Sequence, residues 1–225
     1  MTARASRIRV WDLPTRIFHW TLAALVVFSF TTGKIGGDWM DWHLASGYAI
    51  LALLGFRIAW GFAGSDTARF ARFLRGPRAT LAYARELAAR RHPFVAGHNP
   101  LGGWMIVAML AVLLFQAGTG LFSDDQIATQ GPLAARVSDA TVSRMSSLHS
   151  IGEWIVVALV AVHVAAIVAY RAAWNVRLVG PMVHGRVDAP PGTAQSASKP
   201  VWLAALVLAA SVCAVYVLVE IVAVR

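Results

Sequence analysis

The sequence has 225 residues, of which 58% are hydrophobic and only 14% are charged, and its mean hydropathy is +0.61. Soluble domains carry about 25% charged residues, so this composition excludes an ordinary soluble protein and is typical of a polytopic membrane protein. The net charge of +9 is explained by basic loops that face lipid headgroups, and no nucleic-acid partner is expected. A single cysteine, Cys213, excludes an internal disulfide and an iron–sulfur cluster.

Five apolar runs are long enough to cross a bilayer as helices, which takes about 20 residues each. Asp12, followed by Leu13 and Pro14, predicts an N-cap at the start of the first span. Asp38 is expected to cap the second span in the same way. The first run lacks a signal-peptide cleavage site, so it is expected to remain as a span. The sequence therefore predicts an all-α membrane protein with spans at residues 13–33, 39–62, 101–121, 143–171 and 200–223.

Basic residues concentrate in alternate loops. They occur before the first span, after the second and after the fourth, whereas the loops between hold fewer bases and several acids. Because cytoplasmic loops carry the excess of Lys and Arg, the amino terminus is expected in the cytoplasm and the carboxyl terminus outside. The basic segments include Arg4, Arg7, Arg9 and Arg16, then Arg69, Arg72, Arg75, Arg78, Arg85, Arg90 and Arg91, then Arg171, Arg177, Arg186 and Lys199.

Four of the seven histidines lie within the predicted spans. His149 and His163 are fourteen residues apart in the fourth span, so they project from nearly the same face of one helix, about 21 Å apart. His19 lies near the cytoplasmic end of the first span, and His43 near the outer end of the second. Their depths match in pairs, His43 with His149 on the outer side and His19 with His163 on the inner side.

Imidazole is costly inside hydrocarbon unless something binds it, and haem iron accepts neutral imidazole from two helices of a bundle. Each pair could fill both axial positions of one haem iron, which suits electron transfer rather than binding of a substrate at the metal. For each histidine alone, a hydrogen-bonded structural role is the alternative, but two depth-matched pairs favour haem. His92, His98 and His184 fall in cytoplasmic loops and are interpreted as solvated, with His98 also a candidate border of a quinone site.

Further site candidates follow from the same spacing. Arg57 shares the helix face of His43 at the cytoplasmic level, where it could pair with propionates of the inner haem, and Arg16 is a second candidate one turn before His19. Snorkelling to headgroups is the alternative for both.

Glu153, one turn after His149, is a candidate partner near the outer haem, part of a proton path, or a simple interfacial acid. Glycines in or beside the spans could make room for a porphyrin or a close helix: Gly47, Gly118, Gly120 and Gly152.

Several short motifs occur together in this chain. They are VWDLPTRIFHW at 10–20, FR at 56–57, WGF at 60–62, RGPR at 75–78, GHNPLGGW at 97–104 and QAGTGLF at 116–122. With the two histidines of the fourth span, they resemble the bacterial cytochrome b561 family, which is related to the cytochrome b subunits of nickel-iron hydrogenases. The resemblance covers about residues 8–185. It implies a four-helix transmembrane bundle with two b-type haems, with ligands corresponding to His19, His43, His149 and His163.

The resemblance also implies a function and a location. It indicates a respiratory-chain protein of the bacterial inner membrane that moves electrons between the quinone pool and a redox partner, such as a periplasmic cytochrome c or a hydrogenase-like enzyme. A superoxide:quinone oxidoreductase and a non-redox membrane anchor or transporter remain as alternatives, and whether the chain is an enzyme stays open. The expected domains are a di-haem domain at 1–185, a flexible linker at 186–199, and a fifth C-terminal transmembrane helix at 200–225 that packs on the bundle or meets a partner.

Overall fold

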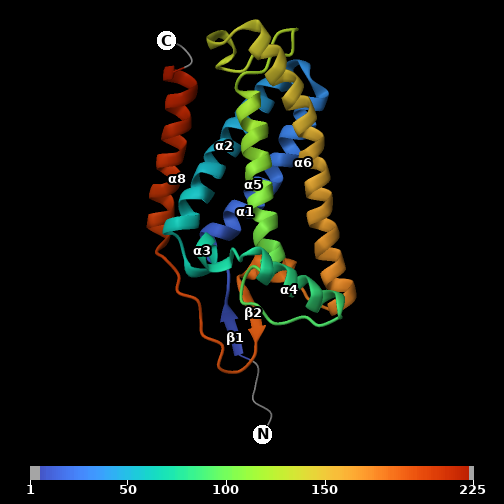
Figure 1. Cartoon of the computed structure of the whole chain (residues 1–225). Helices are drawn as coiled ribbons and strands as arrows, with labels where there is room; N and C mark the ends of the chain where they lie inside the picture. The colour runs from blue at the N-terminus through green and yellow to red at the C-terminus, as the bar shows by residue number, and fades with distance from the viewer. Residues whose placement is uncertain (1–5, 223–225) are drawn as a thin grey trace. The chain divides into compact units, whose positions relative to one another are not determined.

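The computed structural model describes residues 6–222, and almost all of the regular structure there is helical (Figure 1). Five of the described helices are long and apolar enough to cross a membrane, and each coincides with a predicted span. The all-α membrane class is therefore confirmed. Arg4 and the predicted end of the last span at residue 223 lie outside the described residues. The five helices are α1 (Leu13–Ile35), α2 (Met40–Ala63), α5 (Pro100–Gly120), α6 (Asp139–Trp174) and α8 (Val201–Tyr216), which continues as the π-helical turn η4 (Val217–Val222).

Short elements connect the long helices. Two strands, β1 (Ser6–Arg9) and β2 (Arg186–Ala189), pair with each other. The other connecting elements are η1 (Gly37–Trp39), η2 (Asp66–Ala68), α3 (Phe70–Phe73), α4 (Pro77–Ala88), η3 (Ala134–Arg136) and α7 (Val179–His184).

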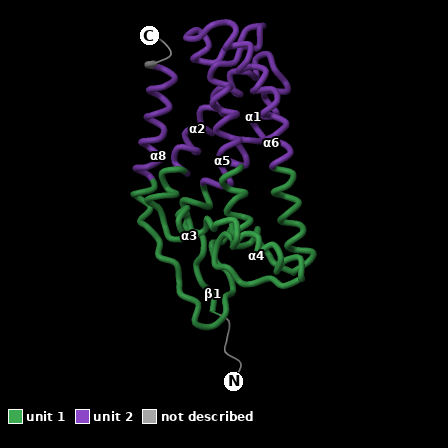
Figure 2. The backbone as a smooth tube through the Cα atoms, in the orientation of Figure 1, with its two compact units in different colours: residues 1–17, 58–108, 160–204 green, residues 18–57, 109–159, 205–225 purple. Residues whose placement is uncertain are grey.

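The chain divides into two compact units (Figure 2). Within the described residues, the first unit holds 6–17, 58–108 and 160–204, and the second holds 18–57, 109–159 and 205–222. All five long helices contribute residues to both units, because the division falls within each of them. The two units are described in turn.

In the first unit, Asp12 fixes the start of α1. Its Oδ1 accepts a hydrogen bond from the backbone N–H of Thr15 at 2.8 Å, which is the geometry of an N-cap and confirms that prediction. Its Oδ2 accepts a second hydrogen bond, at 3.1 Å, from the indole N–H of Trp60 near the end of α2. Both side chains are buried. One carboxylate therefore caps α1 and ties it to α2.

The same unit contains the β1–β2 pair. The strands are antiparallel, with Ser6 opposite Ala189 and Arg9 opposite Arg186. Their buried face joins a hydrophobic cluster made by Ile8, Val10, Trp11 and Ala189, with Ala96, Met182 and Val187 packed against it. The segment predicted as a linker thus starts with an ordered strand, because its pairing partner lies at the opposite end of the sequence. From Pro190 to Pro200 the chain has neither helix nor strand.

In the second unit, the connection from α1 to α2 differs from the prediction. Gly36 and Gly37 both have positive φ, 69° and 55°, a conformation that glycine adopts without steric cost. The turn η1 follows, and Asp38 lies inside it instead of at the N-cap of α2, which begins at Met40. The expectation that Asp38 caps α2 is therefore wrong, because the glycine pair turns the chain before the helix starts.

Within the second unit, the fifth long helix contacts α2. A Cβ placed on Gly55 of α2 would lie 3.4 Å from Oγ of Ser211 on α8, which is a close helix–helix approach. Most residues of α8 are exposed, so most of this helix is available to lipid or to a partner. Packing against α2, one of the two predicted roles, is observed, and contact with a partner stays a prediction.

Candidate functional site

Two of the predicted ligand histidines meet within the second unit. The imidazoles of His43 on α2 and His149 on α6 have ring centroids 6.1 Å apart, with planes at 88°. Imidazole nitrogens bind first-row metals at about 2.0–2.1 Å, so two rings that point at one metal from opposite sides have centres about 6 Å apart. The observed separation fits one metal between the two rings.

Hydrogen bonds to backbone carbonyls fix the tautomer of both imidazole rings. Nδ1 of His43 lies 2.8 Å from the carbonyl oxygen of Ser29 on α1, and Nδ1 of His149 lies 2.9 Å from the carbonyl oxygen of Gln116 on α5. A carbonyl oxygen only accepts, so in each ring Nδ1 carries the proton and donates it. Each Nε2 is then left with the lone pair that a metal needs, and the carbonyl holds the ring in place.

A shared local pattern surrounds these two carbonyls. Three residues after each carbonyl residue comes a buried threonine, Thr32 after Ser29 and Thr119 after Gln116. The two threonine hydroxyls donate to these carbonyls at 3.1 Å and 3.0 Å. Thr119 Oγ1 also lies 3.3 Å from Nδ1 of His149. Helix α1 therefore presents a carbonyl and a threonine hydroxyl to His43 of α2, and α5 presents the same arrangement to His149 of α6.

A glycine follows each of these threonines. A Cβ on Gly33 would lie 2.8 Å from Nδ1 of His43, and a Cβ on Gly120 would lie 2.9 Å from Cε1 of His149. Each ring thus occupies space that any side chain at the glycine would take. By contrast, a Cβ on Gly47 or Gly118 would meet nothing within 4 Å.

Of the predicted glycines, Gly120 makes room for a histidine ring and Gly152 lies against Gln116 of α5, whereas room for a porphyrin at Gly47 and Gly118 stays a prediction; Gly33 of α1 was not predicted. Gly33, Thr32 and Ser29 are site residues that the sequence reasoning missed. The signal that could have found them is the Thr-Gly pair near the end of two spans, at residues 32–33 and again at 119–120. Both pairs lie opposite a histidine.

The donor set fits a haem better than a bare ion. Among the described residues, no group of three or more His, Cys, Asp or Glu side chains could hold a metal ion. A haem iron needs only two axial ligands from the protein, because the porphyrin supplies four nitrogens. Two neutral imidazoles, each with a lone pair on Nε2, are therefore a sufficient protein contribution; in this structure the amide Nε2 of Gln116 lies 3.3 Å from Nε2 of His149.

The other two predicted ligands lie on α1 and α6. His19 belongs to the second unit, where its half-buried ring lies edge-on to Trp20 with centroids 4.9 Å apart. His163 belongs to the first unit and is also half-buried. Their pairing around a second haem stays a prediction.

The two predicted arginines have different surroundings. Arg57 on α2 has an exposed fraction of only 3%, which is incompatible with snorkelling to headgroups. Arg16 on α1 donates from Nη1 to the carbonyl oxygen of Val183 at 2.5 Å and lines a basic cavity in the first unit. Arg57 therefore keeps its interpretation as a partner of a buried anion, whereas Arg16 has a second role open to it.

Glu153 forms an ion pair. Its Oε1 lies 2.5 Å from Nζ of Lys34, near the end of α1, and the ammonium lies over the ring of Trp154, 5.3 Å from its centroid. Of the three predicted roles for Glu153, the interfacial acid is the one this contact supports.

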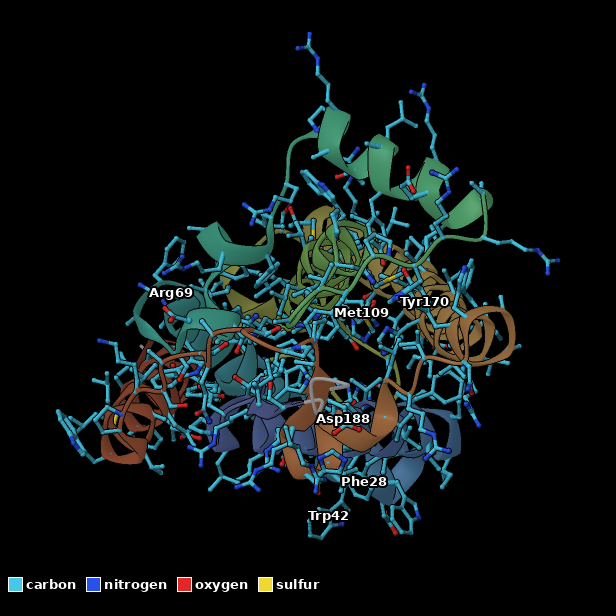
Figure 3. All side chains as sticks on the ribbon, turned by 90° about the horizontal axis from the view of Figure 1, so that it is seen from below. Phe28, Trp42, Arg69, Met109, Tyr170 and Asp188 are labelled. Carbon is cyan, nitrogen blue, oxygen red and sulfur yellow. The ribbon has the colours of Figure 1, made fainter. Side chains whose placement is uncertain are left out.

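Two of the three loop histidines are half-buried, whereas His184 is exposed as predicted. His98 packs against Trp11 and Phe73, with ring centroids 4.4 Å and 5.1 Å away. His92 lies edge-on to Tyr170, which is labelled in Figure 3, at 5.6 Å. His92 and His98 are therefore only partly solvated, because aromatic side chains of α3, of α6 and of the segment before α1 pack against them.

Comparison with known proteins gives the family. The family model for prokaryotic cytochrome b561 matches residues 10–185. The chain belongs to the prokaryotic cytochrome b561 family. A search of curated proteins finds no match. Membership in this family makes the chain a multi-pass membrane protein and a b-type cytochrome of electron transfer, and it confirms the resemblance drawn from the motifs. The matched range includes all four histidines of the predicted spans and ends before α8.

Proposed function

We propose that this cytochrome carries two b-type haems and transfers electrons across the bacterial inner membrane, between the quinone pool and a redox partner. The observation that carries the proposal is the His43–His149 pair, whose ring centroids lie 6.1 Å apart and whose Nδ1 atoms both donate to backbone carbonyls. Two rings held in this way offer both Nε2 atoms to one iron.

His43 and His149 suit this site to electron transfer. A bound haem supplies a one-electron carrier, because its iron is stable in both the ferrous and the ferric state. His43 and His149 would hold the haem through their two Nε2 atoms, and this ligation would leave no open position for oxygen or a substrate. The carbonyls of Ser29 and Gln116 hold the two rings in one orientation, so the ligands need little rearrangement when the charge of the site changes.

The second haem is assigned to His19 and His163. It lies nearer the cytoplasm, since both histidines are close to the cytoplasmic ends of their helices under the proposed orientation. The buried guanidinium of Arg57 is suited to the carboxylates of a porphyrin, because Arg and carboxylate form strong charge-assisted hydrogen bonds. Arg16 remains a second candidate for that contact.

The proposed orientation and partners follow from charge. The excess of Lys and Arg in alternate loops favours an amino terminus in the cytoplasm, so the His43–His149 haem would face the periplasm. It would exchange electrons with a periplasmic cytochrome c or a hydrogenase-like enzyme, and quinone or quinol is the membrane substrate. The proposed di-haem domain is 1–185 together with β2, which pairs with β1, and the irregular segment that follows β2 connects it to the helix in 200–225.

The experiment is a pyridine haemochrome count of haem per chain in histidine variants. Wild type should hold two b haems. H43A and H149A should each hold one, and the double variant H43A/H149A should also hold one, because both residues serve the same haem. H43A/H19A should hold none. The loop variant H92A is the control and should keep two.

Two outcomes would contradict the assignment. One haem in the wild type would remove the second site, and a double variant H43A/H149A without haem would show that these residues serve different haems. The partners need a separate test in proteoliposomes, where quinol should reduce the haems and added cytochrome c should reoxidise them. Reduction of quinone by added superoxide, without cytochrome c, would instead favour the superoxide:quinone oxidoreductase.

A further inference from the structure

A cavity of about 480 Å³ lies in the first unit, between the start of α1, the β1–β2 pair and the segment that leads into α8. This volume is within the range of about 300–1,000 Å³ that is usual for small-ligand sites. The cavity contains none of the four histidines proposed as haem ligands, and of its residues only Arg16 is also a candidate for a haem contact.

The wall of this cavity is strongly basic. Five cationic side chains line it, together with His184, and none of the five makes an ion pair within residues 6–222. Five unpaired cations around one small space create a positive potential, which favours the binding of an anion. The five are Arg7, Arg9, Arg16, Arg186 and Lys199.

The one acid in the wall cannot neutralise these charges. Asp12 lines the cavity, but its exposed fraction is 5%. Its two oxygens already accept from the backbone N–H of Thr15 and the indole N–H of Trp60. The carboxylate therefore serves the start of α1, and the arginines remain without a counter-ion in the wall.

The strand register places like charges side by side. Arg9 lies directly opposite Arg186, and like charges at opposed positions destabilise a strand pair. Asp188, labelled in Figure 3, is on the same face but opposite Arg7, and it forms no ion pair with any arginine that the structure describes. An anion between Arg9 and Arg186 would turn this repulsion into a bridge.

The guanidinium of Arg16 is positioned by one hydrogen bond and retains a further donor. Its Nη1 donates to the carbonyl of Val183 at 2.5 Å, while its buried Nε has no hydrogen-bond partner among the described residues. A Cβ on Gly185 would lie 3.4 Å from that Nε, so the glycine lets the guanidinium lie flat against the chain. A fixed guanidinium with a spare donor is suited to an oxyanion.

We propose that this cavity binds a phosphate group, carried by an anionic phospholipid headgroup or by a free phosphate compound. Arginine forks match the oxygens of phosphate and bind them through charge-assisted hydrogen bonds. Leu13 and Val201, the first residues of α1 and α8, also line the cavity, and the ends of membrane spans lie at the level of the headgroups. The bound phosphate bridges β1, β2 and the segment before α8.

The test is a binding titration of the full, haem-loaded protein in nanodiscs of zwitterionic lipid. Short-chain phosphatidylglycerol is added in one arm and inorganic phosphate in the other, with short-chain phosphatidylcholine as the uncharged control. Tryptophan fluorescence gives both the dissociation constant and the thermal midpoint. Saturable binding in the first arm alone identifies a lipid headgroup, and saturable binding of inorganic phosphate identifies a free phosphate compound.

The variant R9Q/R186Q should weaken that binding by about tenfold or more, because it removes two guanidinium groups that would make charge-assisted hydrogen bonds to the phosphate. The matched control is R78Q/R85Q, which removes the same charge from exposed positions of α4 and should bind like wild type. If R9Q/R186Q loses its haem spectrum, K199Q replaces it, since Lys199 lies outside the strands. No binding in either arm, or equal weakening in R78Q/R85Q, would overturn the proposal.

Discussion

The indole N–H of Trp60 donates a hydrogen bond of 3.1 Å to Oδ2 of Asp12, while Oδ1 of the same carboxylate caps α1. Trp60 has an exposed fraction of 0% and Asp12 of 5%. This contact joins two helices through a single buried carboxylate, and both helices carry proposed haem ligands.

Replacing Asp12 by Ala should therefore lower the free energy of unfolding by about 2–4 kcal/mol, through loss of the cap and of the acceptor for the indole. Denaturant unfolding in detergent, followed by circular dichroism, measures this. Asp12→Asn keeps an acceptor and should cost less. Asp188→Ala, at an exposed strand position, is the control, and an equal loss there would refute the special role of Asp12.

The glycines beside the histidine rings give a second prediction. Gly120→Ala and Gly33→Ala should each reduce the haem content by about one haem per chain or shift the midpoint potential of that haem, because the new methyl would displace a ligand ring. Gly76→Ala, just before α4 and outside the long helices, adds a Cβ that meets nothing within 4 Å and should leave both properties unchanged. A redox titration of the three variants separates the two site glycines from this control, and equal effects in all three would mean that the contact with the rings is not responsible.

The side chain of Gln116 gives a third prediction. Its Nε2 lies 3.3 Å from Nε2 of His149, the nitrogen proposed to bind iron, whereas the backbone carbonyl of Gln116 holds Nδ1. Because only the carbonyl is needed for the proposed ligation, Gln116→Ala should retain two haems per chain and the low-spin spectrum of bis-histidine haem. Loss of the outer haem in this variant, measured by the haemochrome count, would assign the amide a role in holding the cofactor.

The ionisation of Asp66, which lies outside the spans, should make the stability of its surroundings depend on pH. The Arg69 guanidinium and the backbone N–H of Ala197 hold the pKa of the Asp66 carboxyl below its ordinary value of 3.8. Because the folded-state pKa is lowered, the stabilisation from Asp66 is complete above about pH 4 and is lost as the pH falls through the lowered value.

Asp66 connects the turn η2 to the segment before α8, since its Oδ2 accepts from Ala197 N–H at 3.2 Å. Asp66→Asn should therefore increase proteolytic cleavage in 190–199 at pH 7, and the difference from wild type should shrink below about pH 4. Cleavage that differs equally at all pH values would show that the charge of Asp66 is not responsible.

The sequence by itself determined the membrane class and the span positions, because length and apolarity are local properties of each run. It also determined the cap at Asp12, which depends on neighbouring residues alone. The four histidines stood out for the same reason, since a polar ring within an apolar run is visible without any neighbour in space. Asp38 shows the limit of such reasoning, because two glycines with positive φ changed where the next helix begins.

Only the tertiary structure decided which groups meet. The carbonyls of Ser29 and Gln116 that orient the two rings, and the glycines that admit them, belong to helices other than those of the histidines. The β1–β2 pair and its basic cavity join residues from opposite ends of the chain, and α8 contacts α2 through Ser211 and Gly55. Contacts of this kind depend on how helices and strands pack, and no local pattern of residues encodes that packing directly.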